Sequence, residues 1–261
     1  MHNDILHIGN FTLHGYSLMI ALGFIIGMSL CLLKAKKDKK NGDIITDIGM
    51  ITILAGFLGG KILYLIVDFK NLIANPKSVL GFPQVFSGFV VFGGIIGGFI
   101  AVCIYSKIKK INALEYLDYM IPFIALVQGF GRIGCFLAGC CYGGPTDSFL
   151  GVVFPQGSIA PAGVKLWPTQ LFSAFGDFAI AGILLLVSTK NKKNGNICIL
   201  YLILYSVGRF IVEFFRNDPR GAVGALSTSQ FISIIMLPIA IALGLVLNFY
   251  KKKETNNEKQ N

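Results

Sequence analysis

Arginine is the residue type whose positions most strongly suggest chemistry in this chain. The sequence contains four arginines, each at an end of an apolar segment or in the loop that follows one: Arg132, Arg209, Arg216 and Arg220. A guanidinium keeps its charge, and its planar fork binds phosphate or carboxylate through paired hydrogen bonds. Arg132 and Arg209 each follow a glycine, and we expect them to bind an anion such as a lipid phosphate. For Arg220, beside Asp218, we expect local ion pairs.

Other ionisable residues lie inside the apolar segments, where a charge is costly and usually faces a partner or a wet cavity. Asp177 lies near the middle of its segment, and we expect it to have a structural role, with Lys61 as one candidate to neutralise it. Three further acids, Asp47, Glu115 and Asp118, lie near segment ends and are expected to reach the membrane interface.

Three of the six cysteines lie in one glycine-rich stretch: Cys135, Cys140 and Cys141. A disulfide or a metal cluster is conceivable, but neighbouring cysteines chelate one ion poorly and no histidine is near. We therefore expect no metal and no cofactor, and small packing residues with one reactive thiol; a disulfide is the alternative. Histidines occur only at or before the first apolar segment, so a general base would be His14, a carboxylate, a tyrosine or a cysteine.

The segments that must position these residues are long and apolar. The chain has 261 residues, of which 54% are apolar and 14% charged, against about 25% charged in soluble domains. Runs of roughly 20 apolar residues are long enough to cross a bilayer as helices. They lie at Tyr16–Leu33, Ile44–Val67, Gly88–Tyr105, Ala113–Phe130, Thr169–Ser188, Ile197–Val212 and Phe231–Tyr250. The pattern predicts an all-α integral membrane protein with about seven transmembrane helices; the alternation of a β-barrel is missing.

Lysine clusters follow every odd-numbered run. The clusters lie within residues Lys34–Lys40, Lys107–Lys110, Lys190–Lys193 and Lys251–Lys259. The positive-inside rule places these clusters in the cytoplasm, so the N-terminus is expected outside and the C-terminus inside. No basic residue precedes the first run, which argues for a retained helix and against a cleaved signal peptide. The net charge of +10 is thereby explained without nucleic acid.

This pattern predicts a single transmembrane domain over residues 1–250, an outer loop over 131–167 and a polar cytoplasmic tail over 251–261. Glycines recur at short spacing in the second and third runs, including Gly59, Gly60, Gly93 and Gly94. Small residues at such spacing let transmembrane helices approach closely, so we expect these glycines to pack helices together; room for an acyl chain is the alternative.

Several segments, in order along nearly the whole chain, resemble motifs of the bacterial prolipoprotein diacylglyceryl transferases. The similar segments are His14-Gly-Tyr16-Ser-Leu-Met, Gly59-Gly60-Lys61-Ile-Leu-Tyr64, Gly88-Phe-Val-Val-Phe92-Gly93-Gly94, Gly131-Arg132-Ile-Gly134 to Gly143, Trp167-Pro168-Thr169-Gln170-Leu171-Phe172, and Tyr205-Ser-Val-Gly-Arg209-Phe-Ile-Val-Glu213-Phe-Phe-Arg216. The signature segment that begins at Gly131 and the segment from Tyr205 to Arg216 are the most specific. The ordered set is stronger than any single match.

The resemblance implies an enzyme that moves a diacylglyceryl group from phosphatidylglycerol to the cysteine thiol of a lipoprotein signal peptide, releasing glycerol phosphate. The implied partners are phosphatidylglycerol, prolipoprotein signal peptides and the bilayer of the bacterial plasma membrane. Arg132 and Arg209 match the essential arginines of the family. The implied lipid-binding or supporting residues are Tyr16, Lys61, Gly131, Tyr205, Glu213 and Arg216. The helical spacing of Arg209, Glu213 and Arg216 allows one shared face.

This chain departs from the family pattern at polar positions. The signature has two asparagines and a glutamate where Cys135, Ala138 and Cys140 stand, and the family histidines are Phe92 and Trp167. Phe92 cannot accept a proton. Either another group then deprotonates the acceptor thiol, or the thiol ionises unaided in an electropositive site. Two alternatives are a divergent paralogue with another acceptor and a non-catalytic lipid-binding or transport protein.

Overall fold

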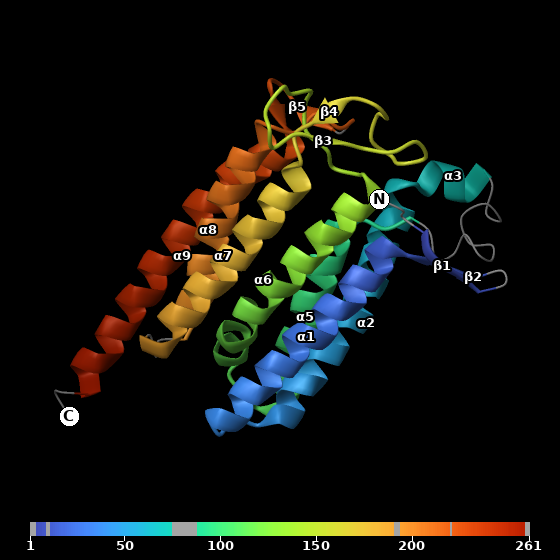
Figure 1. Ribbon diagram of the computed structural model, residues 1–261. Helices are drawn as coiled ribbons and strands as arrows, with labels where there is room; N and C mark the ends of the chain where they lie inside the picture. Colours follow the sequence, from blue (N-terminus) through green and yellow to red (C-terminus); the bar gives the residue numbers. More distant parts are fainter. Residues whose placement is uncertain (1–3, 9–10, 75–87, 191–193, 220, 259–261) are drawn as a thin grey trace. The chain divides into compact units, whose positions relative to one another are not determined.

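The computed structural model describes residues 4–8, 11–74, 88–190, 194–219 and 221–258, so Arg220 and the ion pairs predicted for it lie outside the described residues. Within these ranges seven helices are long and apolar enough to span a membrane. They are α1 (Gly15–Lys37), α2 (Gly42–Val67), α5 (Val91–Lys109), α6 (Ala113–Ala138), α7 (Thr169–Lys190), α8 (Asn196–Glu213) and α9 (Thr228–Glu258) (Figure 1). The prediction of an all-α protein with seven spans is confirmed.

The remaining described elements are short and were not predicted from the sequence. They are the helix α3 (Phe69–Ala74) and three antiparallel hairpins: β1 (Asp4–Ile8) with β2 (Phe11–His14), β3 (Val152–Val153) with β4 (Lys165–Leu166), and β5 (Ala222–Val223) with β6 (Leu226–Ser227). Large apolar side chains such as Leu54, Ile66 and Leu186 are more than half exposed on the long helices. A hydrocarbon solvent explains such exposure, because lipid tails cover these side chains as well as a protein core would.

One predicted boundary was wrong. The outer loop was predicted over 131–167, but α6 continues through Ala138, so the loop begins at Gly139. Gly131 and Gly134 do not break α6, because in a bilayer the backbone groups must be satisfied within the helix. Gly139 ends it, because its φ of +73° is a left-handed conformation that glycine adopts without strain. The polar tail predicted from residue 251 follows the apolar span, which ends at Phe249, and α9 continues into this tail as far as Glu258.

The chain divides into two compact units, residues 32–116 and residues 1–31 with 117–261. In the first of these units α2 and α5 pack against each other through their glycines. The glycine spacing predicted close packing of helices but did not identify this pair. A Cβ built on Gly59 would collide with the backbone oxygen of Gly93, and the reverse collision also holds. The two backbones are therefore in direct contact, which only glycine permits.

Replacing Gly59 by valine is expected to push α2 away from α5 and to destabilise the protein by about 1–3 kcal/mol, the usual cost of overpacking. Gly182 in α7 provides the matched control, since a Cβ there would meet no atom within 4 Å. Thermal unfolding of the purified variants in detergent measures both effects. Equal melting temperatures for Gly59→Val and Gly182→Val would contradict the contact.

In the larger unit α7, α8 and α9 lie side by side, with the β3, β4 and β5 segments gathered at one end of them (Figure 1). Small and branched side chains, including Ala125, Ile180 and Leu184, form a buried core between α6, α7 and α8. Asp118, near the start of α6, is buried, and its carboxylate accepts hydrogen bonds from the backbone N–H groups of Gly195 and Cys198. It thereby caps the first turn of α8 and fixes that helix against α6.

Candidate anion-binding site

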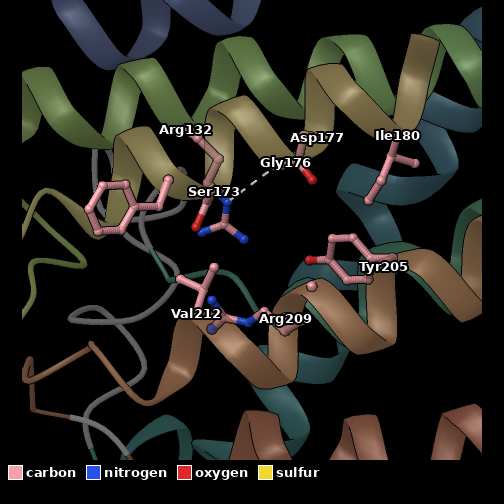
Figure 2. Close-up of a pocket in the computed structure, with 10 residues that line it drawn as sticks. Arg132, Ser173, Gly176, Asp177, Ile180, Tyr205, Arg209 and Val212 are labelled. Carbon is pink, nitrogen blue, oxygen red and sulfur yellow. Dashed lines mark ion pairs between the residues drawn. The ribbon is translucent and has the colours of Figure 1, made fainter. Parts of the chain in front are cut away.

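Arg132 and Arg209 line one pocket formed by α6, α7 and α8. The pocket residues are Arg132, Phe172, Ser173, Gly176, Asp177, Ile180, Tyr205, Gly208, Arg209 and Val212. Figure 2 shows the two arginines entering this space from opposite sides, Arg132 from α6 and Arg209 from α8. The glycines Gly176 and Gly208 leave it open, since a Cβ on either would meet nothing within 4 Å. The sequence prediction that these two arginines share a site agrees with this geometry.

Arg132 is held by a carboxylate on the neighbouring helix. Its Nε lies 4.0 Å from Oδ2 of Asp177, and the Asp177 side chain is only 7% exposed (Figure 2). Arg132 thus provides a counter-charge for Asp177 that the sequence analysis did not identify, while the pairing with Lys61 that it suggested stays a prediction. At 4.0 Å the pair orients the guanidinium while leaving much of its hydrogen-bonding capacity for another acceptor.

Arg209 is only partly satisfied by the protein. Its Nη2 donates a hydrogen bond of 2.9 Å to Oγ of Ser229 and lies 3.1 Å from Oε2 of Glu213. Its Nη1 is buried and has no hydrogen-bond partner among the residues that the structure describes. A buried donor without a partner carries a full desolvation cost. A bound anion would remove that cost and would also screen the repulsion between Arg132 and Arg209.

Glu213 joins two arginines beneath the pocket. Its buried carboxylate lies 3.1 Å from Arg209 and 3.7 Å from Arg216, at the helical spacings that the sequence predicted. Arg216 also holds Asp218 through two hydrogen bonds, of 2.9 and 2.8 Å. Burial alone would lower the pKa of Arg216, but the hydrogen bonds to Asp218 and the charges of Cys141 and Glu213 raise it above its usual value. Arg216 therefore remains cationic, and its role in phosphate binding stays a prediction.

Tyr205 brings a hydroxyl into the pocket. Figure 2 shows this hydroxyl directed toward the space between the arginines. The ring stacks on Tyr201 with centroids 5.6 Å apart, and the Tyr201 hydroxyl donates to Oε1 of Gln128 on α6 at 2.5 Å. This chain of contacts fixes Tyr205 at the pocket wall, where its hydroxyl can donate to an oxygen of a bound ester.

Three other predicted site residues, Tyr16, Gly131 and Lys61, are not among the residues that line this pocket. Tyr16, in the first turn of α1, packs its backbone on Gly134 and interacts electrostatically with Arg132. Gly131 has open space where a side chain would be, and a role for it in binding stays a prediction. Lys61 belongs to the unit of residues 32–116, where its ammonium lies 4.8 Å from the ring centroid of Tyr64. A role for Lys61 in lipid binding stays a prediction.

Sequence reasoning gave no role to Thr169 and Gln170, although they belong to one of the recognised motifs. Both are buried at the start of α7. The Thr169 hydroxyl donates to the backbone oxygen of Cys141 at 2.6 Å, and Nε2 of Gln170 donates to that of Cys140 at 2.7 Å. These bonds tie the segment after α6 to α7. The sequence signal that could have identified Thr169 and Gln170 is the presence of two polar residues at the start of an apolar helix.

The three cysteines of this segment converge. The sulfur atoms of Cys135, Cys140 and Cys141 all lie within 4.8 Å of one another, and all three are free thiols. Hydrogen bonds from the Cys135 and Cys140 thiols, aided by the positive charges of Arg216 and Arg132, lower the pKa of Cys141 despite its burial. The sequence had placed these residues in one segment but had not predicted this convergence.

Comparison with known proteins identifies the family. The family model described as prolipoprotein diacylglyceryl transferase matches residues 3–246. The chain belongs to this family. It is 46% identical over 246 residues to phosphatidylglycerol–prolipoprotein diacylglyceryl transferase 2 of Clostridium perfringens, covering 94% of this chain and 95% of that one.

Other members of the transferase family are also similar. The enzyme named phosphatidylglycerol–prolipoprotein diacylglyceryl transferase in Clostridium tetani is 48% identical over 92% of this chain and 95% of its own length. The one from Clostridioides difficile is 32% identical over 95% of this chain and 96% of its own length. The matched part of this transferase-family chain includes every residue of the pocket.

Proposed function

We propose that this protein transfers a diacylglyceryl group from phosphatidylglycerol to the cysteine thiol of a prolipoprotein signal peptide and releases glycerol phosphate. The observation that carries this proposal is the pair of arginines, Arg132 and Arg209, in one pocket with a buried donor on Arg209 that lacks a partner among the described residues. The names of the similar proteins support the same donor and acceptor and favour an enzyme over a lipid carrier.

The reaction requires a leaving group that departs as an anion. The acceptor sulfur forms a bond to the terminal glycerol carbon of the lipid, and the bond between that carbon and the phosphate oxygen breaks. The electron pair of the broken bond leaves with the phosphate ester. Fixed cationic groups near that oxygen stabilise the charge as it develops, at no cost of reorganisation. Arg132 and Arg209 are placed for this role, and Tyr205 can donate a hydrogen bond to the same group.

The pocket is too small for a whole lipid. The space not filled by protein atoms is about 330 Å³, its open side included, and two acyl chains do not fit there. We therefore place the headgroup between the arginines and leave the chains among the bilayer lipids, against exposed side chains such as Phe175 of α7.

The lysine distribution supports a position of this pocket toward the outer leaflet. The clusters at the ends of α1, α5 and α7 mark the cytoplasmic side by the positive-inside rule. Arg132 and Arg209 lie near the opposite ends of their helices. The proposed location is the bacterial plasma membrane, where exported signal peptides present their cysteine on the outer side.

Complementation tests the proposed function. The chain is expressed in bacteria depleted of their own diacylglyceryl transferase, with an empty vector and Arg132→Ala as controls. We expect growth to recover and a reporter lipoprotein to gain the mass of a diacylglyceryl group with the wild-type chain alone. Unmodified reporter in cells that contain normal amounts of the wild-type chain would reject the proposal.

A further inference from the structure

The sulfur atoms of Cys135, Cys140 and Cys141 form a compact triangle beside the arginine site. All three lie within 4.8 Å of one another. Three thiolates around a Zn²⁺ ion, each about 2.3 Å from it, lie roughly 3.8 Å apart. The side chains therefore need to move by less than about 1 Å to hold such an ion. Thiolate sulfur is also the ligand type that selects zinc over harder cations.

The backbone explains how two neighbouring cysteines face one point. Cys141 has a φ of +62°, a left-handed conformation that is uncommon for a residue with a Cβ. This turn directs consecutive side chains to the same side, against the sequence expectation that Cys140 and Cys141 would chelate poorly together. Hydrogen bonds from Thr169 and Gln170 to the carbonyls of Cys141 and Cys140 hold the turn in place. Cys135 joins them from the last turns of α6.

The charges around the triangle suit a thiolate-bound ion. Arg132 and Arg216 both interact electrostatically with Cys141, and Arg132 also does so with Cys135. Three thiolates and one Zn²⁺ carry one net negative charge, which two neighbouring guanidinium groups can balance. Three protein ligands also leave the fourth position of a tetrahedral ion open, as in catalytic zinc sites.

From this geometry we propose that Cys135, Cys140 and Cys141 bind a zinc ion whose open position takes the acceptor thiol as a thiolate. The inference rests on the proposed function, because the acceptor is the signal-peptide cysteine. Coordination to zinc removes the proton from a thiol, and the proton passes to water. The bound sulfur then attacks the glycerol carbon, the carbon–oxygen bond breaks, and the phosphate leaves toward the arginines. The ion thereby provides the activated thiol in a chain with Phe92 and Cys140 at positions where the family pattern has a histidine and a glutamate.

Metal content is the first readout, and it does not depend on transfer activity. The full-length protein is purified anaerobically in detergent, without chelators, and its zinc is measured by elemental mass spectrometry. We expect about one ion per chain in the wild type and a large loss in Cys135→Ser, Cys140→Ser and Cys141→Ser. Cys103→Ser, in α5, is the matched control and should keep the ion. Thermal unfolding of each variant shows that it is folded.

The acceptor position is tested with cobalt in place of zinc. Adding a signal peptide that contains the acceptor cysteine should change the thiolate-to-cobalt absorption, whereas the same peptide with serine should not. Four results would overturn the inference. They are only trace zinc in the folded wild type, equal zinc in the three variants and the wild type, a disulfide between any two of these cysteines, and no response to the cysteine peptide. Transferase activity in a protein without metal would overturn the zinc site but leave the proposed function standing. A zinc-loaded protein that responds to the peptide but never consumes phosphatidylglycerol would instead reject the proposed function.

Discussion

Replacing Arg132 by alanine is expected to reduce diacylglyceryl transfer by about 10²–10³-fold, the loss seen when a fixed group that stabilises developing charge is removed. Arg132 is one of two guanidiniums in the pocket, and Asp177 holds it in place. Its removal also leaves the buried carboxylate of Asp177 without that counter-charge. The rate is measured with purified protein in phosphatidylglycerol vesicles and a signal-peptide substrate.

Arg132→Lys separates charge from geometry. Lysine keeps the positive charge but lacks the planar fork, so an intermediate rate is expected. Lys190→Ala serves as the control, because it removes an exposed cation from the C-terminal end of α7, and Lys190 does not line the pocket. We expect its transfer rate to be close to that of the wild type. An Arg132→Ala protein that is folded and as active as Lys190→Ala would contradict a role for Arg132 in the reaction.

Glu213→Ala is expected to lower both stability and activity. The buried carboxylate lies between Arg209 and Arg216, and removal of one partner from a buried ion pair costs about 3–5 kcal/mol. Without it Arg209 keeps its hydrogen bond to Ser229 but loses the contact that holds its guanidinium along α8. We therefore expect a lower melting temperature, and a transfer rate reduced by about tenfold or more, since each 1.4 kcal/mol of lost positioning is a factor of ten.

Asp218→Asn is the matched comparison for Glu213. Asp218 pairs with Arg216 through two hydrogen bonds, and its side chain is 15% exposed whereas that of Glu213 is fully buried. Asp218 also pairs with one arginine where Glu213 pairs with two, so its replacement is expected to cost less stability. Thermal unfolding and transfer rates should rank Glu213→Ala well below Asp218→Asn. If Asp218→Asn is the more damaging variant, the central position given to Glu213 in the arginine network is wrong.

The spans were predictable because the bilayer imposes their length and composition. Each predicted run overlaps a helix of the structure, and the glycines of α2 and α5 lie at a close helix contact, the kind of packing that their spacing suggested. The end of α6 was not predictable from glycine content. Gly131 and Gly134 lie within the helix, whereas Gly139 ends it, and only the left-handed φ of Gly139 distinguishes them. The short hairpins carry too little apolar pattern to be recognised.

Part of the site was also visible in the sequence. The spacing of Arg209, Glu213 and Arg216 predicted that they would lie together, and the structure shows the ion pairs. Arg216 lies just past the end of α8, so the three residues do not share one helix face. The partner of Asp177 was not visible, since contacts between helices depend on rotation and depth that a single sequence does not encode. The convergence of Cys140 and Cys141 depends on a backbone turn that their residue types disfavour.

The most direct test of the central claim, that two guanidiniums hold a departing glycerol phosphate, is a single-turnover measurement of glycerol phosphate release. Purified protein is placed in vesicles of headgroup-labelled phosphatidylglycerol and mixed with a signal peptide that carries either cysteine or serine at the acceptor position. We predict one labelled glycerol phosphate for each peptide modified, with cysteine only, and almost none with Arg132→Ala or Arg209→Ala. Release at the wild-type rate by either folded arginine variant, or none by the wild type, would contradict the claim.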